Sequence, residues 1–171
     1  MAITTNTAET ARAINREIQW LRHPRSADGV ELHDGTSVHV GDAIATRRND
    51  PTARTDQGEK VRNRQTWTVA ATHDDGAITA RHDERGSVVL PADYVARHVE
   101  LGWAVTGYGN QGHTVDIGIA VLEGSASRNH SYVAMTRGRQ ANHALVVDTS
   151  DTTDPAERLT EIVTRPTTVE S

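Results

Sequence analysis

The sequence predicts an α/β protein in which a parallel sheet with helices is interrupted by a small inserted β-barrel. An amphipathic helical pattern follows a short strand at the amino terminus. Residues 30–90 then carry short strands separated by turn dipeptides, which is typical of a small barrel. Strands and helices alternate again from residue 91, and repeated β-α-β order indicates parallel strands. We therefore assign 1–29 and 91–171 to one α/β domain and 30–90 to the insert.

The amino-terminal segment predicts a strand over 1–5 and a helix over 7–22. Asn6 is the expected N-cap, with Glu9 completing a capping box, and Pro24 closes the helix. The apolar residues that recur at helical spacing are Ala8, Ala11, Ile14, Ile18 and Leu21.

The insert is predicted from strands that flank glycine-containing turns. Asp34-Gly35 and Asp74-Asp75-Gly76 each separate two apolar runs, which is a hairpin signal. Residues 50–59 have no apolar periodicity, so a loop is expected there. The expected strands are 30–32, 38–40, 43–47, 67–71, 77–80 and 87–90.

The carboxyl-terminal part predicts a second run of alternating strands and helices. A turn with a short helix is expected over 110–116, and Asp154 with Glu157 forms the capping box of a final helix that ends near Val163. The other expected elements are strands over 101–105, 117–122 and 143–147 and a helix over 129–138.

Composition excludes several classes of protein. The 171 residues are 36 % hydrophobic and 24 % charged, as in soluble globular domains, and the absence of Cys excludes disulfides and thiolate metal sites. No apolar run is long enough to span a membrane, and residues 1–9 lack the order of a signal peptide, so a cytoplasmic location without membrane contact is expected. The nine histidines include no short-spaced pair, so solvated strand histidines and no metal site are expected.

Charge is distributed unevenly along the chain. The net charge of −5 argues against a general nucleic-acid coat protein. One stretch is nevertheless basic, and Arg47 and Arg48 at its start are candidate phosphate contacts. Seventeen of the eighteen basic residues are Arg, so a compositional bias is the alternative explanation. The basic residues of this stretch are Arg47, Arg48, Arg54, Lys60, Arg62 and Arg64.

Two polar segments about twenty residues apart carry the chemical signal. Residues 102–116 read Gly-Trp-Ala-Val-Thr-Gly-Tyr-Gly-Asn-Gln-Gly-His-Thr-Val-Asp, and glycines after a strand let backbone N–H groups approach a ligand. Residues 131–139 read Ser-Tyr-Val-Ala-Met-Thr-Arg-Gly-Arg. The two arginines of the second segment either complement a helix dipole or reach a phosphate. Either segment alone is more often structural than functional.

In order, these segments resemble motifs V and VI of superfamily 1 helicases. The resemblance is to the RecD-like branch, and within it to the helicase half of conjugative relaxases of the TraA or TrwC type. Residues 30–100 resemble the SH3-like barrel inserted in such helicases, most clearly over 40–50 and 90–95. The resemblance implies that the α/β part is a partial RecA-like sheet, the second motor domain of a helicase.

The resemblance also implies roles for individual residues. Arg137 matches the motif VI arginine finger and is the catalytic candidate, and Arg139 and Gly112 are further nucleotide-binding candidates. We expect Arg137 to be exposed and to lack a buried carboxylate partner. Two positions depart from the family, because Tyr108 stands where His is frequent and Arg64 replaces the Gly of an Asn-Gly turn. The residues expected along single-stranded DNA are Thr106, Tyr108, Asn110, Gln111 and Thr114, together with Arg47 and Arg48.

The rest of the motor is absent from this sequence. A P-loop needs Gly-x-x-x-x-Gly-Lys-Ser/Thr, and the only lysine, Lys60, follows Glu59. ATP and Mg²⁺ are therefore expected only with a partner chain that supplies the P-loop, and the chain alone should not hydrolyse ATP. The expected partners are single-stranded DNA, bound weakly, and a relaxase or motor half in trans. The alternatives are a stand-alone module that binds single-stranded DNA and a non-catalytic protein-interaction module.

Overall fold

The computed structural model describes residues 1–24, 29–107, 115–124, 126–147 and 154–165 of the chain. The contacts between residues divide the chain into two compact units. The first unit is Met1–Arg12 with Ala104–Ser171, and the second is Ala13–Trp103. No helix among the described residues has the length and apolarity needed to cross a membrane.

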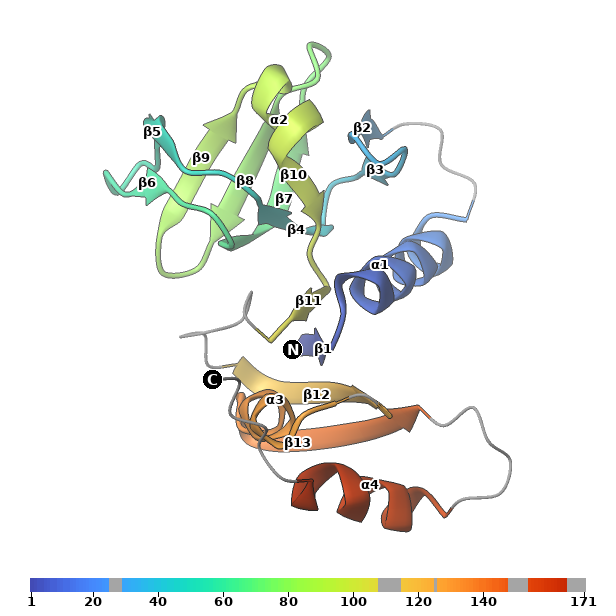
Figure 1. The fold of residues 1–171 in the computed structure, drawn as a ribbon. Coiled ribbons are helices and arrows are strands. Elements are labelled where there is room, and N and C mark those ends of the chain that lie inside the picture. Colours follow the sequence, from blue (N-terminus) through green and yellow to red (C-terminus); the bar gives the residue numbers. More distant parts are fainter. Residues whose placement is uncertain (25–28, 108–114, 125, 148–153, 166–171) are drawn as a thin grey trace, which may run out of the picture. The chain divides into compact units, whose positions relative to one another are not determined.

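The first unit is built on a four-stranded parallel sheet in the order β11-β1-β12-β13 (Figure 1). Each neighbouring pair is parallel, which confirms the predicted parallel sheet. Its strands are β1 (Ala2–Thr5), β11 (Ala104–Thr106), β12 (Val115–Glu123) and β13 (Gly138–Val147). Strand β12 begins at Val115, inside the expected turn and short helix over 110–116, so the part of that expectation that covers 115–116 is wrong. Residues 108–114 lie outside the described residues.

Two helices share a core with strands β12 and β13. Helices α3 (Arg128–Met135) and α4 (Pro155–Thr164) contribute buried Ala134 and Ile162, which pack with Ala120 and Leu122 of β12. The side chain of Asp154 accepts a hydrogen bond from the Ala156 N–H, as an N-cap does. The order of strand, helix, strand and helix predicted from residue 117 onward is therefore confirmed.

Helix α1 (Ala8–Arg22) has a different cap from the one expected. The hydroxyl of Thr7 accepts the Thr10 N–H at 3.1 Å, the N-cap to third-residue hydrogen bond. Asn6 is one residue too early to do so, and its side-chain oxygen is buried without a hydrogen-bond partner among the described residues. The helix starts with a Thr cap because the chain enters it one residue later than the capping-box pattern indicates.

The second unit contains a five-stranded antiparallel sheet in the order β10-β4-β7-β8-β9 (Figure 1). Two small hairpins accompany it, β2-β3 and β5-β6. Its strands are β2 (Val30–Glu31), β3 (Ser37–Val38), β4 (Ala43–Thr46), β5 (Asp50–Arg54), β6 (Lys60–Val61), β7 (Thr66–Thr72), β8 (Ile78–His82), β9 (Gly86–Leu90) and β10 (Val99–Leu101). One apolar core holds Ile44, Val69, Ile78 and Leu90, each at most 1 % exposed. The predicted SH3-like barrel is thus present.

Three elements of this unit differ from the sequence prediction. The expected loop over 50–59 contains strand β5 and leads into β6. Helix α2 (Ala92–His98) was not predicted and buries Tyr94 and Val95. The single strand expected over 101–105 is divided at Gly102 into β10 of the barrel sheet and β11 of the parallel sheet. The contact unit therefore extends beyond residue 90 to Trp103.

Candidate nucleic-acid interface

The loop between β6 and β7 is tied to strand β4 and presents basic side chains. Thr46 donates its hydroxyl to the Arg62 carbonyl at 2.6 Å, and its own carbonyl accepts the Arg64 N–H at 2.7 Å. Gln65 is buried, and its side-chain oxygen accepts the Arg62 N–H at 2.7 Å. Arg64 has a φ of 66°, the left-handed conformation that favours Gly. Arg64 therefore adopts a Gly-like backbone conformation at the position where the sequence resemblance leads us to expect Gly.

Basic side chains on this loop and on the neighbouring hairpin face solvent. Lys60 and Arg62 are exposed, and no carboxylate pairs with either among the described residues. A shallow hollow of about 310 Å³ lies beside them. Its lining residues are Asn49, Asp50, Pro51, Lys60, Val61 and Arg62. The two unpaired cations make this hollow a candidate contact for an anion such as phosphate.

The two arginines singled out from the sequence occupy different environments. Arg47 is half-buried and makes two 2.7 Å contacts to Glu100 on β10, so its charge is already neutralised. Arg48 is exposed, and its guanidinium lies 3.5 Å from the imidazole of His98. Of this pair, Arg48 is the one available to a phosphate.

Asp50 is the negative group of the hollow, and it has a structural role. The Thr52 hydroxyl and N–H and the Ala53 N–H all donate to one carboxylate oxygen of Asp50. These hydrogen bonds, the one from the Thr52 hydroxyl above all, hold the pKa of Asp50 below its ordinary value of 3.8. The carboxylate therefore stays ionised at neutral pH and fixes the backbone at the start of β5.

Removing the Thr52 hydroxyl should raise the pKa of Asp50. Because the folded pKa lies below the unfolded one, the carboxylate stabilises the fold above the unfolded pKa, and this contribution disappears as pH falls through the folded value. In a carboxyl ¹³C NMR titration, Thr52→Ala should move the Asp50 midpoint upward. The control is Thr68→Ala, at an exposed position on β7. An unchanged midpoint in Thr52→Ala would contradict the assignment of the hydroxyl as the main cause.

The parallel sheet separates the two ends of the motif V segment. Thr106 is the last residue of β11 and pairs with Thr5 of β1. Thr5 also pairs with Val121 of β12. Val121 lies six residues beyond Val115, or about 20 Å along the strand. Thr106, which is half-buried, therefore lies near the carboxyl edge of the sheet, and residues 107–114 lead from there to the start of β12. Of the motif V candidates, Tyr108, Asn110, Gln111, Gly112 and Thr114 lie outside the described residues.

Arg137 lies where α3 ends and β13 begins, at the opposite edge of the sheet from Thr106. Its carbonyl accepts the Val115 N–H at 3.0 Å, so the fold places the arginine beside the residue that follows Thr114. Its guanidinium Nε donates to the Val133 carbonyl in the last turn of α3 at 3.0 Å. Arg137 is half-buried rather than exposed as expected, because this hydrogen bond draws it onto its own helix. Among the described residues no carboxylate lies within ion-pair distance of it.

Arg139 is bound to a neighbouring strand. Its guanidinium lies 3.2 Å from a carboxylate oxygen of Asp116 on β12, and both side chains are exposed. The register of β12 with β13 shifts next to Asp116, between Val115 and Ile117. The ion pair occupies the guanidinium of Arg139, so Arg139 is less available to a nucleotide than Arg137.

Sequence reasoning missed the residues that build the loop of the interface. Thr46 and Gln65 are polar residues in a strand-rich region and show no motif, although both are buried. The expectation that the histidines are solvated is wrong for His39, which is 9 % exposed. The signal that could have found it is its position between two apolar strands, three residues before an aspartate.

Comparison with known proteins identifies the barrel first. Residues 30–100 match the Rv2311 SH3-like barrel domain. Two curated relatives, the Uncharacterized proteins Rv2311 and MT2373 from two strains of Mycobacterium tuberculosis, are each 35 % identical over 92 residues. The matched region is 53 % of this chain and 53 % of each relative, so the chain spans about half the length of the curated relatives it matches.

Solved structures extend the likeness to most of the chain. Pif1 helicase from Bacteroides in complex with ADP-AlF3 and ssDNA matches 86 % of this chain and 40 % of its own, with a TM-score of 0.60 and 17 % identity. Bacteroides Pif1 bound to ssDNA matches 84 % and 40 %, with a TM-score of 0.56 and 16 % identity. Pif1 helicase from Candida albicans matches 87 % and 45 %, with a TM-score of 0.52 and 11 % identity. At these identities the likeness shows the fold alone, a parallel sheet with helices joined to an SH3-like barrel.

Proposed function

We propose that this chain is the part of a superfamily 1 DNA helicase that contacts single-stranded DNA. The observation that carries the proposal is the combination of folds, a parallel four-stranded sheet and an SH3-like barrel in one chain. The same combination covers 86 % of the chain in its likeness to a Pif1 helicase whose structure contains ssDNA. Neither fold alone would indicate DNA, because both occur in proteins of many functions.

The charge of the barrel surface supports this proposal. The chain carries a net charge of −5, so a solvent-facing cluster of unpaired cations is a local feature rather than a general one. Lys60 lies on β6 and Arg62 directly follows that strand, and hydrogen bonds with the side chains of Thr46 and Gln65 hold the Arg62 backbone in place. A backbone phosphate at this hollow would release condensed counterions, which makes binding sensitive to salt.

The finer assignment rests on the sequence resemblance. We propose that the chain derives from the helicase half of a conjugative relaxase, with the segment that begins at Thr106 along the DNA and Arg137 as the finger toward a nucleotide. The residues of this chain cannot hold ATP and Mg²⁺ by themselves, because no P-loop sequence is present. A nucleotide site would need a second chain or segment that supplies the P-loop. In the alternative proposal, the chain is a DNA-binding or interaction module without a motor role.

Reversing the charges at the hollow should weaken DNA binding. We expect micromolar, salt-sensitive binding of a labelled oligothymidylate by the full chain in fluorescence anisotropy. The double change Lys60→Glu and Arg62→Glu should weaken it at least about tenfold and reduce the salt slope by about 1.4, roughly 0.7 for each lost phosphate contact.

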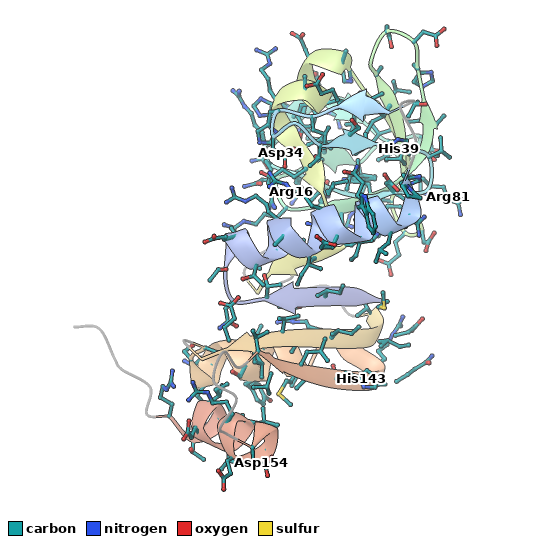
Figure 2. All side chains as sticks on the ribbon, turned by 90° about the vertical axis from the view of Figure 1, so that its right-hand side faces the viewer. Arg16, Asp34, His39, Arg81, His143 and Asp154 are labelled. Carbon is teal, nitrogen blue, oxygen red and sulfur yellow. The ribbon has the colours of Figure 1, made fainter. Side chains whose placement is uncertain are left out.

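A matched control separates the hollow from net charge. Arg81 on β8, labelled in Figure 2, and Arg97 on α2 are both exposed, and their double change to Glu alters the net charge by the same amount. This control should bind nearly as the unchanged protein does. An equal loss in both double variants would show that net charge, rather than the hollow, governs binding. No binding at high protein concentration would favour the protein-interaction module.

A further inference from the structure

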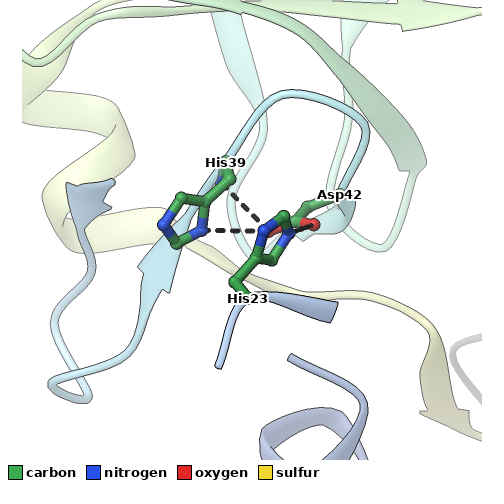
Figure 3. A group of neighbouring side chains, drawn as sticks. All are labelled: His23, His39 and Asp42. Carbon is green, nitrogen blue, oxygen red and sulfur yellow. Dashed lines mark hydrogen bonds and ion pairs between the residues drawn. The ribbon is translucent and has the colours of Figure 1, made fainter. Parts of the chain in front are cut away.

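Two imidazoles and a carboxylate meet at the end of α1. His23 follows α1, His39 follows β3, and Asp42 precedes β4 (Figure 3). The His23 Nε2 lies 2.8 Å from Asp42 Oδ1, and the His39 Nδ1 lies 3.6 Å from Asp42 Oδ2. The two rings are stacked with their centroids 4.2 Å apart. Each residue offers one ligand atom, and these three atoms all lie within 4.8 Å of one another.

Asp42 and His39 are buried and His23 is half-buried, and part of the cluster lacks a hydrogen-bond partner among the described residues. Asp42 is fully buried, and its Oδ2 accepts the His39 N–H at 2.9 Å, which fixes the carboxylate in place. His39 is 9 % exposed, and neither of its ring nitrogens has a hydrogen-bond partner among the described residues. Buried polar atoms are nearly always satisfied in folded proteins. An unpartnered imidazole that lies beside a buried carboxylate therefore points to a missing partner.

We propose that His23, His39 and Asp42 bind a divalent transition-metal ion of the Zn²⁺ class. Two imidazole nitrogens and one carboxylate oxygen are ligands that Zn²⁺ accepts, and three protein ligands leave a fourth position for water. Two ligand atoms bound to one tetrahedral ion at about 2.1 Å lie about 3.4 Å apart. The three ligand atoms observed here lie within 4.8 Å of one another, so binding requires side-chain rotations that bring them closer and turn the two stacked rings toward one ion.

Such an ion would replace two weaker interactions. The hydrogen bond between His23 and Asp42 would give way to metal bonds from both groups. Arg22 is a competing cation, with its Nε 3.7 Å from Asp42 Oδ1, but its side chain is 47 % exposed and has room to leave. The result would be a metal link between the end of α1 and the turn that joins β3 to β4. This proposal goes beyond the proposed DNA contact and does not depend on it.

The test is isothermal titration of the metal-free full chain with Zn²⁺. We expect one equivalent to bind and His23→Gln to weaken the affinity at least about tenfold, since even partners outside the ligand shell cost about 10–100-fold when they are removed. Arg22→Ala should retain or tighten binding, because it removes the competing charge. His73→Gln, at an exposed histidine of the same unit, is the matched control and should bind unchanged.

A second measurement does not depend on any variant folding. Imidazole ¹⁵N NMR of the unchanged protein should show that Zn²⁺ shifts the ring nitrogens of His23 and His39 ahead of those of the other seven histidines. The absence of saturable binding would overturn the proposal. So would full affinity in a folded His23→Gln variant, or first shifts at histidines outside the cluster.

Discussion

Replacing Gly138 by Ala is expected to lower the free energy of unfolding of the parallel-sheet unit by about 3 kcal/mol, the upper end of typical overpacking costs. A Cβ at this position would lie 2.0 Å from the Ala141 carbonyl oxygen and 2.7 Å from the Gly118 backbone nitrogen. Both neighbours are backbone atoms, one on β13 itself and one on β12, so relief requires the backbone of β13 to change and the two strands to move apart. The Gly138 N–H and carbonyl also form hydrogen bonds with the Asn142 side chain, which such a shift would strain.

The location of the tryptophans gives this experiment an internal reference. Trp20, Trp67 and Trp103 all lie in the Ala13–Trp103 unit. The unfolding transition monitored by tryptophan fluorescence should therefore change little, while amide hydrogen exchange in β12 and β13 should become faster. Gly124→Ala is the control, since its Cβ would meet only the end of the Arg158 side chain at 3.2 Å. Equal amide exchange rates in Gly138→Ala and Gly124→Ala would show that the close approach at Gly138 is relieved without loss of stability.

Arg137→Ala is expected to separate stability from catalysis. The change removes the hydrogen bond to the Val133 carbonyl at the end of α3, which should cost about 0.5–1 kcal/mol. If a P-loop motor half is supplied in trans, the same change should reduce the ATPase activity of the pair by about 10³–10⁵-fold, the range found for arginine fingers. The chain alone should show no ATPase activity above a mock-purified control, with or without single-stranded DNA.

Arg139→Ala is the matched control for this prediction. It removes an exposed ion pair with Asp116 on the same unit and should change both stability and activity little. A large loss of stability in Arg137→Ala, with the reconstituted activity unchanged, would show that Arg137 is only a helix cap. In that case its assignment as a finger would be wrong.

The regular elements were predictable because each had a periodic apolar pattern or a turn signal. The α1 pattern and the Asp34-Gly35 hairpin are confirmed within a few residues. Strand β5 could not be found in this way, because Pro51, Thr52 and Arg54 are exposed and leave no apolar alternation. The start of this strand is fixed instead by hydrogen bonds from Thr52 to the Asp50 side chain.

The division of the strand expected over 101–105 depends on a contact that sequence does not record. A Cβ at Gly102 would lie 2.5 Å from the Ile44 backbone carbon, so only Gly allows β10 to approach β4 this closely. The candidate site shows the same limit. The sequence indicated Arg47 and Arg48 as candidates. An ion pair with Glu100 neutralises Arg47, and a partner fifty-three residues away leaves no local signal in the sequence.

Helix α1 determines how this chain can be dissected. Its residues up to Arg12 belong to one contact unit, and those from Ala13 onward belong to the other. A fragment that starts at Ala13 would sever the helix in mid-turn and expose N–H groups that now donate within it. A fragment that keeps the whole helix would carry five residues of the other unit, 8–12. We therefore expect limited proteolysis to leave this helix uncut. An exchange of the barrel between relatives will need the helix and the barrel to be exchanged together.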